Sequence, residues 1–162
     1  MKNHAIKLCA VSILALGPSC MPLSPTPPTV TPAVSPEGVR VAVVAQACSQ
    51  GRDYDDRGED LAEESVRVEV QNSSPANATI QREQFRLRTP DGFALAPQTW
   101  GAAEPLSVSA GATQRFELRF MARGLECARE VRLDPRSGVR LGDKPVALAA
   151  VRFVPSERVA SP

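Results

Sequence analysis

Few side chains in this sequence of 162 residues have the chemistry needed for catalysis or metal binding. The only histidine is His4, in the N-terminal segment, so the rest of the chain can build neither a Ser-His-Asp triad nor an imidazole metal site. The remaining candidates are four cysteines at positions 9, 20, 48 and 127, one acidic cluster at residues 52–60, and a single tryptophan, Trp100.

The first residues have the composition of an export signal. Lys2 and Lys7 precede an apolar run, Leu8–Leu16, and residues 1–16 contain no acidic residue. As a helix this run would be about 14 Å long, too short for a bilayer core of ~30 Å. The prolines that follow at positions 18, 22, 25, 27 and 28 leave no neighbouring segment on which a buried helix could pack. We therefore expect residues 1–19 to be a signal peptide and not a transmembrane helix.

The segment Gly17-Pro18-Ser19-Cys20 joins the apolar run to a proline-rich stretch. It resembles the cleavage box of bacterial lipoproteins, in which small residues precede a cysteine that is lipidated and becomes the new N-terminus. Ser19 fits that box, whereas Gly17 stands where the family usually has leucine, and Pro18 is unusual. The resemblance implies that Cys20 carries acyl chains such as palmitate and anchors the protein in a membrane. Ordinary secretion, with cleavage after Gly17, is the alternative.

Residues 20–37 form the predicted linker between this anchor and the folded domain. Proline, serine and threonine dominate it, a composition that favours extended polyproline II at ~3.1 Å per residue. A linker of this length can hold a domain up to about 50 Å from the bilayer.

The cysteine count agrees with a lipidated Cys20. Cys9 leaves with the signal, so that two cysteines remain, Cys48 and Cys127, and in an oxidising compartment we expect them to form one disulfide. In the chain-entropy model, closing a loop of about 80 residues contributes about 4–5 kcal/mol. Two buried free thiols are the alternative.

Composition argues against nucleic-acid binding and against most catalytic mechanisms. The chain has 19 basic and 18 acidic side chains, so no basic surface for nucleic acid is expected. The only lysine beyond the signal, Lys144, lies in the turn-like Gly-Asp-Lys-Pro, and the few aromatic residues disfavour a carboxylate glycosidase. We expect no enzyme, no catalytic residue, no metal and no cofactor.

From residue 38 onward the hydrophobic period is two, which indicates strands with one buried and one wet face. In residues 64–71 the valines at 66, 68 and 70 alternate with charged residues, and residues 115–120 repeat the pattern with Phe116, Leu118 and Phe120. Short strands with frequent Gly, Pro, Asn and Asp turns predict an all-β fold, a β-sandwich over residues 38–155, followed by a disordered tail at 156–162. We expect strands near 38–48, 64–72, 77–81, 84–89, 92–96, 105–109, 113–121, 127–134 and 146–154.

Three segments in order carry a further resemblance. These are Glu64–Asn72, with its terminal asparagine, Phe85–Gly92, which runs into an Asp-Gly turn, and Ser109–Phe120, in which a glycine turn introduces a strand ending in phenylalanine. Together they resemble an immunoglobulin-like module of bacterial exported lipoproteins of unknown function. The resemblance covers roughly residues 38–154 and implies a fold and a compartment, but no common activity and no site to carry over. The Cys48 and Cys127 pair departs from that family.

The acidic cluster, Arg52–Asp60, could offer carboxylate oxygens to Ca²⁺. Its spacing lacks the EF-hand pattern and Arg52 and Arg57 offset its charge, so a solvated loop is the preferred interpretation. Trp100 lies in a loop rich in Pro, Gly and Ala, where it would either anchor a partner or cap the core.

These inferences lead to a functional prediction. We expect an exported, lipid-anchored envelope protein, outer-membrane or periplasmic, whose β-sandwich binds another protein as an accessory of a secretion, motility or adhesion assembly. A cell-surface module that binds glycan or calcium is the alternative. The sequence does not specify the partner or the oligomeric state.

Overall fold

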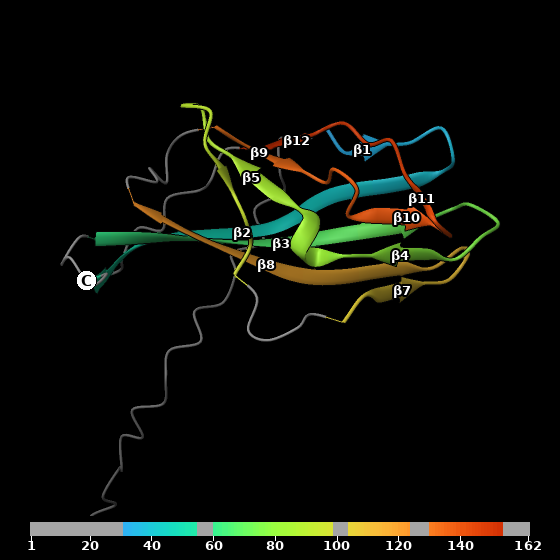
Figure 1. Cartoon of the computed structure of the whole chain (residues 1–162), viewed down its shortest axis with the longest axis horizontal. Helices are drawn as coiled ribbons and strands as arrows, with labels where there is room; N and C mark the ends of the chain where they lie inside the picture. The colour runs from blue at the N-terminus through green and yellow to red at the C-terminus, as the bar shows by residue number, and fades with distance from the viewer. Residues whose placement is uncertain (1–30, 55–59, 99–103, 124–129, 154–162) are drawn as a thin grey trace, which may run out of the picture.

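The computed structural model of the chain describes residues 31–54, 60–98, 104–123 and 130–153, with only the backbone at 50–54 and 60. It is an all-β sandwich built from antiparallel strands in three sheets, and it confirms the predicted fold class (Figure 1). No helix among these residues has the length and apolar character needed to cross a bilayer.

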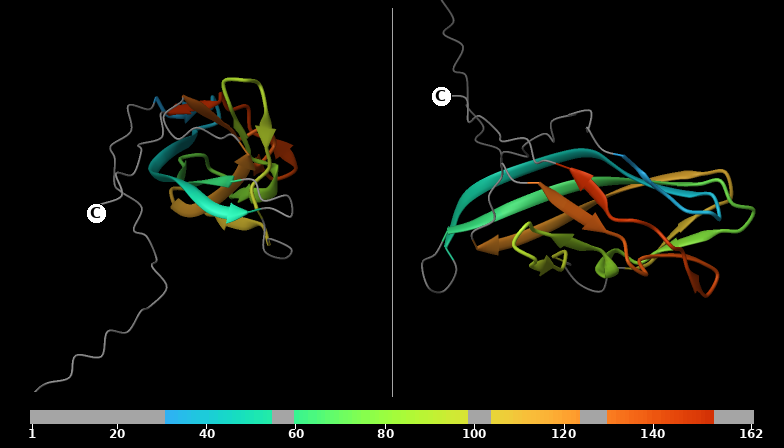
Figure 2. Two further views of the ribbon diagram at one scale, coloured as in Figure 1. Left: turned by 90° about the vertical axis from the view of Figure 1, so that its left-hand side faces the viewer. Right: turned by 90° about the horizontal axis from the view of Figure 1, so that it is seen from above.

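Sheet A holds the long strands and forms one layer. Its order is β1-β2-β3-β8, with bounds Ala33–Val34, Val39–Tyr54, Asp60–Asn72 and Thr113–Arg123. The three long strands run along the length of the molecule, and the shorter strands lie over one face of them (Figures 1 and 2). Irregularities at Val43/Ala45 and Gln50/Asp53 interrupt the pairing of β2 with β3, and such bulges bend and twist a strand.

Two short sheets make up the opposite layer. Sheet B has the order β11-β10-β4-β7, with bounds Lys144–Pro145, Val139–Leu141, Ala78–Ile80 and Leu106–Val108. Sheet C has the order β12-β9-β5-β6, with bounds Val151–Phe153, Val131–Asp134, Arg86–Arg88 and Ala94–Leu95. A single 3-10 turn, Arg82–Gln84, leads from β4 of sheet B to β5 of sheet C.

The core lies between the layers and follows the predicted alternation. Val66, Val68 and Val70 of β3 are fully buried, and Ile80, Leu87 and Leu133 meet them from the short sheets in one cluster. Phe85 packs edge to face on Phe116 of β8, with 5.6 Å between ring centroids, and so joins the layers. Gly138 is required beside this pair, since a Cβ there would lie 2.7 Å from the Phe85 ring.

Asn72 fixes the end of β3 from a fully buried position. Its Nδ2 donates to the carbonyl oxygens of Ala76 at 2.8 Å and Val108 at 3.0 Å, while its Oδ1 accepts from the Ser74 backbone and hydroxyl. One side chain therefore holds together the β3–β4 connection and β7.

Several predicted boundaries differ from the structure. β1 lies inside the range predicted as linker, because Ala33 is buried and pairs with β2. The predicted strand at 146–154 contains strand only at Val151–Phe153, because the chain must first cross from sheet B to sheet C. The acidic cluster is not loop throughout, since Asp53 pairs with Leu61 and Tyr54 with Asp60 in the β2–β3 hairpin. The pattern did not predict β10 and β11.

Candidate functional site

The outer face of sheet A places arginine opposite glutamate across neighbouring strands. Glu69 of β3 accepts from Arg40 at 3.4 Å and from Arg115 at 2.7 Å, so it pairs with both neighbouring strands. Arg67 lies directly opposite Glu117 in the register of β3 and β8. Cross-strand pairs of opposite sign stabilise a sheet modestly.

The outer face of sheet C has a different arrangement. Arg88 of β5 lies opposite Arg132 of β9, and Arg132 lies opposite Arg152 of β12. We call these three residues the arginine row. The residues next to them in each strand point into the core, so all three guanidinium groups stand on the solvent side. Like charges in directly opposed positions destabilise a sheet.

Acidic neighbours compensate the arginine row only in part. Arg88 donates from Nε to Asp134 at 3.0 Å, and Arg136 shares that same carboxylate at 3.6 Å. Arg132 is 3.6 Å from Glu130, and both side chains are half exposed. Arg152 makes no ion pair or side-chain hydrogen bond with any residue in the described part of the chain. Among the described residues, the row therefore has unmatched positive charge toward its β12 end.

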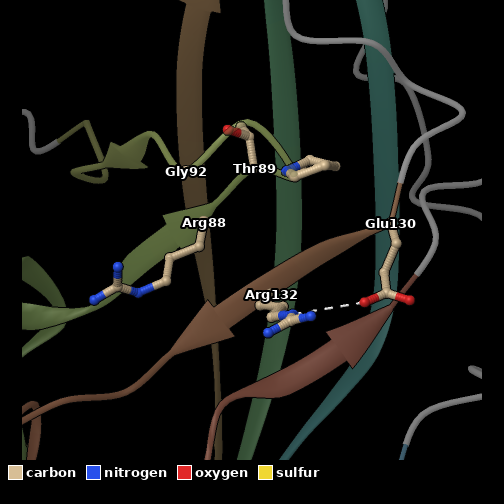
Figure 3. Close-up of a pocket in the computed structure, with 6 residues that line it drawn as sticks. Arg88, Thr89, Gly92, Glu130 and Arg132 are labelled. Carbon is tan, nitrogen blue, oxygen red and sulfur yellow. Dashed lines mark ion pairs between the residues drawn. The ribbon is translucent and has the colours of Figure 1, made fainter.

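A pocket of about 490 Å³ opens beside the row. Its walls are the β5–β6 turn and the start of β9, through Arg88, Thr89, Pro90, Gly92, Glu130 and Arg132. In Figure 3 the Arg132 guanidinium points toward the Glu130 carboxylate, while the Arg88 side chain extends away from both. The Thr89 hydroxyl in this wall is buried and has no hydrogen-bond partner among the described residues.

The β5–β6 turn also presents an aromatic ring. Gly92 donates to the Thr89 carbonyl at 3.0 Å, with Pro90 at the favoured turn position and Gly92 at φ +89°, where L side chains are strained. The turn places Phe93 next in the chain with 68% of its surface exposed, one of the two large apolar residues exposed in the described part. An exposed aromatic ring of this kind is a candidate apolar anchor for a partner.

Most predicted site residues lie outside the described residues. These are the lipidation residue Cys20, the cysteine Cys127 and the proposed partner anchor Trp100. Cys48 is described: it lies on β2, is 2% exposed, and is bonded in a disulfide. Since the other cysteines fall outside the described ranges, the pairing of Cys48 with Cys127 stays a prediction.

The calcium hypothesis depends on the side chains of the acidic cluster, which the structure does not describe. Residues 55–59 of the acidic cluster are not described, and of the adjoining residues only the backbone is. Elsewhere, within the described ranges, no group of three or more potential metal-ligating side chains occurs.

Sequence analysis missed one buried carboxyl. Glu64 of β3 is fully buried, and neither of its oxygens has a hydrogen-bond partner among the described residues. It lies opposite Cys48 and Phe120 in the sheet register, and burial raises the pKa of Glu64 to about 8. Its even spacing with Val66, Val68 and Val70 is the signal that could have placed it in the core.

The arginine row was also missed, because it is assembled from three separate segments. Arg88, Arg132 and Arg152 each alternate with apolar residues, as any half-exposed strand does, and only strand order and register bring them together. Phe93 had a local signal, since it follows directly on the Asp-Gly turn.

Comparison with known proteins establishes the fold but not a family. No protein-family model and no curated protein sequence matches this chain. The fold is similar to that of a Bacillus subtilis protein described as a lipoprotein (ycdA), with TM-score 0.56 and 15% identity over 75% of this chain. It is also similar to a functionally unknown protein of Listeria monocytogenes, with TM-score 0.53 and 12% identity over 83% of this chain and 90% of that one.

The match to the Bacillus protein is partial, since this chain covers 38% of its length. A secreted protein of Mycobacterium tuberculosis, MPT63, gives a weaker match, with TM-score 0.44 and 14% identity over 73% of this chain and 91% of that chain. At these identities the matches to the Bacillus and Listeria proteins support a shared β-rich fold and no more.

Proposed function

We propose that this protein is a non-enzymatic lipoprotein of the bacterial cell envelope, anchored through Cys20, whose immunoglobulin-like sandwich binds another protein. In this proposal the outer face of sheet C is the binding surface. The protein then acts as an accessory of an envelope or cell-surface assembly such as a secretion, motility or adhesion machinery.

The unmatched charge of the arginine row is the observation that carries this proposal. On sheet A, Arg67 and Arg115 stand opposite Glu117 and Glu69 in the register of β3 and β8, as expected where charges serve the fold alone. On sheet C three arginines oppose one another, and Arg152 makes no ion pair with a described residue. An arrangement that violates the local pairing rule at some cost to stability is typical of a functional surface.

The side chains on the outer face of sheet C are of a type common in protein–protein interfaces. Guanidinium groups are among the side chains that most often dominate protein interfaces, and here they are presented from short, well-packed strands. The sandwich supplies a rigid base, because Leu87, Leu133 and Val151 fix the same strands in the core.

Site-specific photo-crosslinking in cells tests the proposal. A photoreactive residue replaces Ala94, which is exposed and lies opposite Arg88 at the end of the row, or Gln71, which is exposed on the outer face of sheet A. We expect a discrete adduct with another envelope protein from position 94 and little from position 71. Equal adducts from both positions, or an adduct from position 71 alone, would contradict a binding face on sheet C.

A further inference from the structure

The composition of the arginine row indicates what kind of partner it fits. The row places the Cα atoms of opposed arginines about 5 Å apart, at the spacing of neighbouring strands, and each arginine presents a planar guanidinium group on the solvent side. A guanidinium donates two parallel hydrogen bonds to a carboxylate, so several in line favour a segment that carries several carboxylates.

Glu130 shows how a carboxylate can pair with Arg132 of the arginine row. It lies at the rim of the pocket, 3.6 Å from Arg132, with both side chains 49% exposed. A pair this open and this long contributes little to stability. A carboxylate from another molecule can therefore replace Glu130 on Arg132 at small cost, and the pocket beside the two residues provides the room.

The surroundings favour a protein segment over a membrane surface. Binding to anionic lipid relies on dense clusters of Lys and Arg with few acids among them. Here Asp134 and Glu130 each pair with an arginine of the row, and the exposed Phe93 follows the pocket residue Gly92 in the chain. Charge complementarity with an apolar side contact fits an acidic peptide segment.

We propose that the pocket and the arginine row bind an acidic segment of the partner protein, with one of its carboxylates replacing Glu130 on Arg132 and a second reaching Arg152. This inference rests on the proposed function and names the chemistry of the partner at the same site. Glu130 then acts as an internal competitor whose removal strengthens binding.

Binding of defined probes to the purified exported protein in detergent micelles tests this inference. The probes are a hexaglutamate peptide, the matching hexaglutamine peptide, inorganic phosphate, and mixed micelles that contain phosphatidylglycerol compared with mixed micelles that contain phosphatidylcholine. We expect the glutamate peptide to bind and the glutamine peptide not to bind, with affinity falling as salt is added. We expect that inorganic phosphate does not compete with the glutamate peptide. We also expect that phosphatidylglycerol competes with the peptide no more than phosphatidylcholine does.

Matched variants locate the binding. Arg132→Gln and Arg152→Gln should each weaken hexaglutamate binding by about fivefold or more, as expected for a lost charge-assisted hydrogen bond at a half-exposed site. Arg67→Gln, on the exposed outer face of sheet A, should leave binding unchanged. Glu130→Gln should strengthen binding several-fold, a gain that a merely structural role for Glu130 would not produce.

Three results would overturn the inference: no binding of hexaglutamate, equal loss in Arg67→Gln, or weaker binding in Glu130→Gln. Preferential binding of phosphate or phosphatidylglycerol would assign the row to a different ligand, and concentration-dependent self-association that requires Arg152 would assign it to a second copy of the chain. Failure of the peptide while the adduct from position 94 persists would reject the acidic segment and leave the proposed function standing.

Discussion

At the scale of single residues, Glu64 is the clearest conflict between side chain and environment. Its carboxyl is fully buried beside Cys48 and Phe120, and its oxygens lack partners among the described residues. Burial disfavours the charged form, which raises the pKa of Glu64 from 4.5 to about 8 in the folded protein. The folded protein therefore holds a proton that the unfolded chain releases between these two pH values.

This proton predicts the direction of the pH dependence of stability. The free energy of unfolding should fall as pH rises from about 4.5 to about 8, because only the folded state keeps the proton in that window. Glu64→Gln should remove this slope, giving a gain over wild type that grows to the order of 4 kcal/mol near pH 8, at about 1.4 kcal/mol per pKa unit. Urea unfolding at several pH values measures it.

An exposed carboxyl provides the control for Glu64. Glu104→Gln should leave the pH profile of unfolding unchanged, because Glu104 is exposed. Parallel profiles for wild type and Glu64→Gln between pH 4.5 and 8 would show that Glu64 does not hold the proton.

Two aromatic residues provide a second residue-scale prediction. Phe93 is 68% exposed beside the pocket, so Phe93→Ala should leave the melting temperature nearly unchanged and weaken partner capture by about 2 kcal/mol. Trp100 stays a candidate anchor from the sequence, and Trp100→Ala distinguishes its two possible roles. A loss of about 3–5 kcal/mol in the stability of Trp100→Ala would identify Trp100 as a core cap. Unchanged partner capture in Phe93→Ala would show that Phe93 is not part of the interface.

At the scale of elements, the junction of β3, β4 and β7 depends on Asn72. Asn72→Ala would leave the carbonyls of Ala76 and Val108 and the hydroxyl of Ser74 without this buried partner. We expect a loss of about 3 kcal/mol, in line with several buried polar groups left unsatisfied. Asn77→Ala is the matched control, since Asn77 is exposed and accepts only from Ala110 at 3.3 Å. Similar urea midpoints for the two variants would contradict this role.

The elements that sequence predicted are those with a long alternating pattern. β3 and β8 have five or more alternating positions each, so their buried face is evident without the structure. β10 and β11 have only three and two residues. Strands this short show no alternating hydrophobic pattern that could be recognised in the sequence. β1 contains two residues within a proline-rich stretch, and its pairing with β2 depends on tertiary packing.

The candidate site was less predictable than the fold for a physical reason. A strand's buried face is encoded along one segment, whereas the arginine row requires β5, β9 and β12 to be neighbours in a particular register. The sequence shows each arginine as an ordinary solvent-facing residue. Only Phe93, displayed by the Pro-Asp-Gly turn, had a signal within its own segment.

At the scale of the whole molecule, the proposed anchor would determine where the proposed binding face operates. The linker is long enough to extend sheet C tens of ångströms from a bilayer. Cys20→Ala should release the protein from the membrane fraction, because a lipid anchor would be lost while the sandwich stays intact. Fractionation with immunoblotting measures this, and Cys9→Ala, within the predicted signal, serves as the control. A Cys20→Ala protein that still sediments with membranes would contradict lipidation at this position.

The central claim is that the outer face of sheet C binds a partner, and the outer face of sheet A serves as the reference surface. Sheet A pairs its charges across strands, and sheet C opposes three arginines. The most direct measurement is the yield of the position-94 adduct, together with the melting temperature, in wild type, in the Arg132→Gln/Arg152→Gln double variant and in Arg67→Gln. We predict that the double variant melts at or slightly above the wild-type temperature, because like-charge repulsion is relieved, and loses the adduct by roughly tenfold or more. An undiminished adduct in a folded double variant would contradict the account.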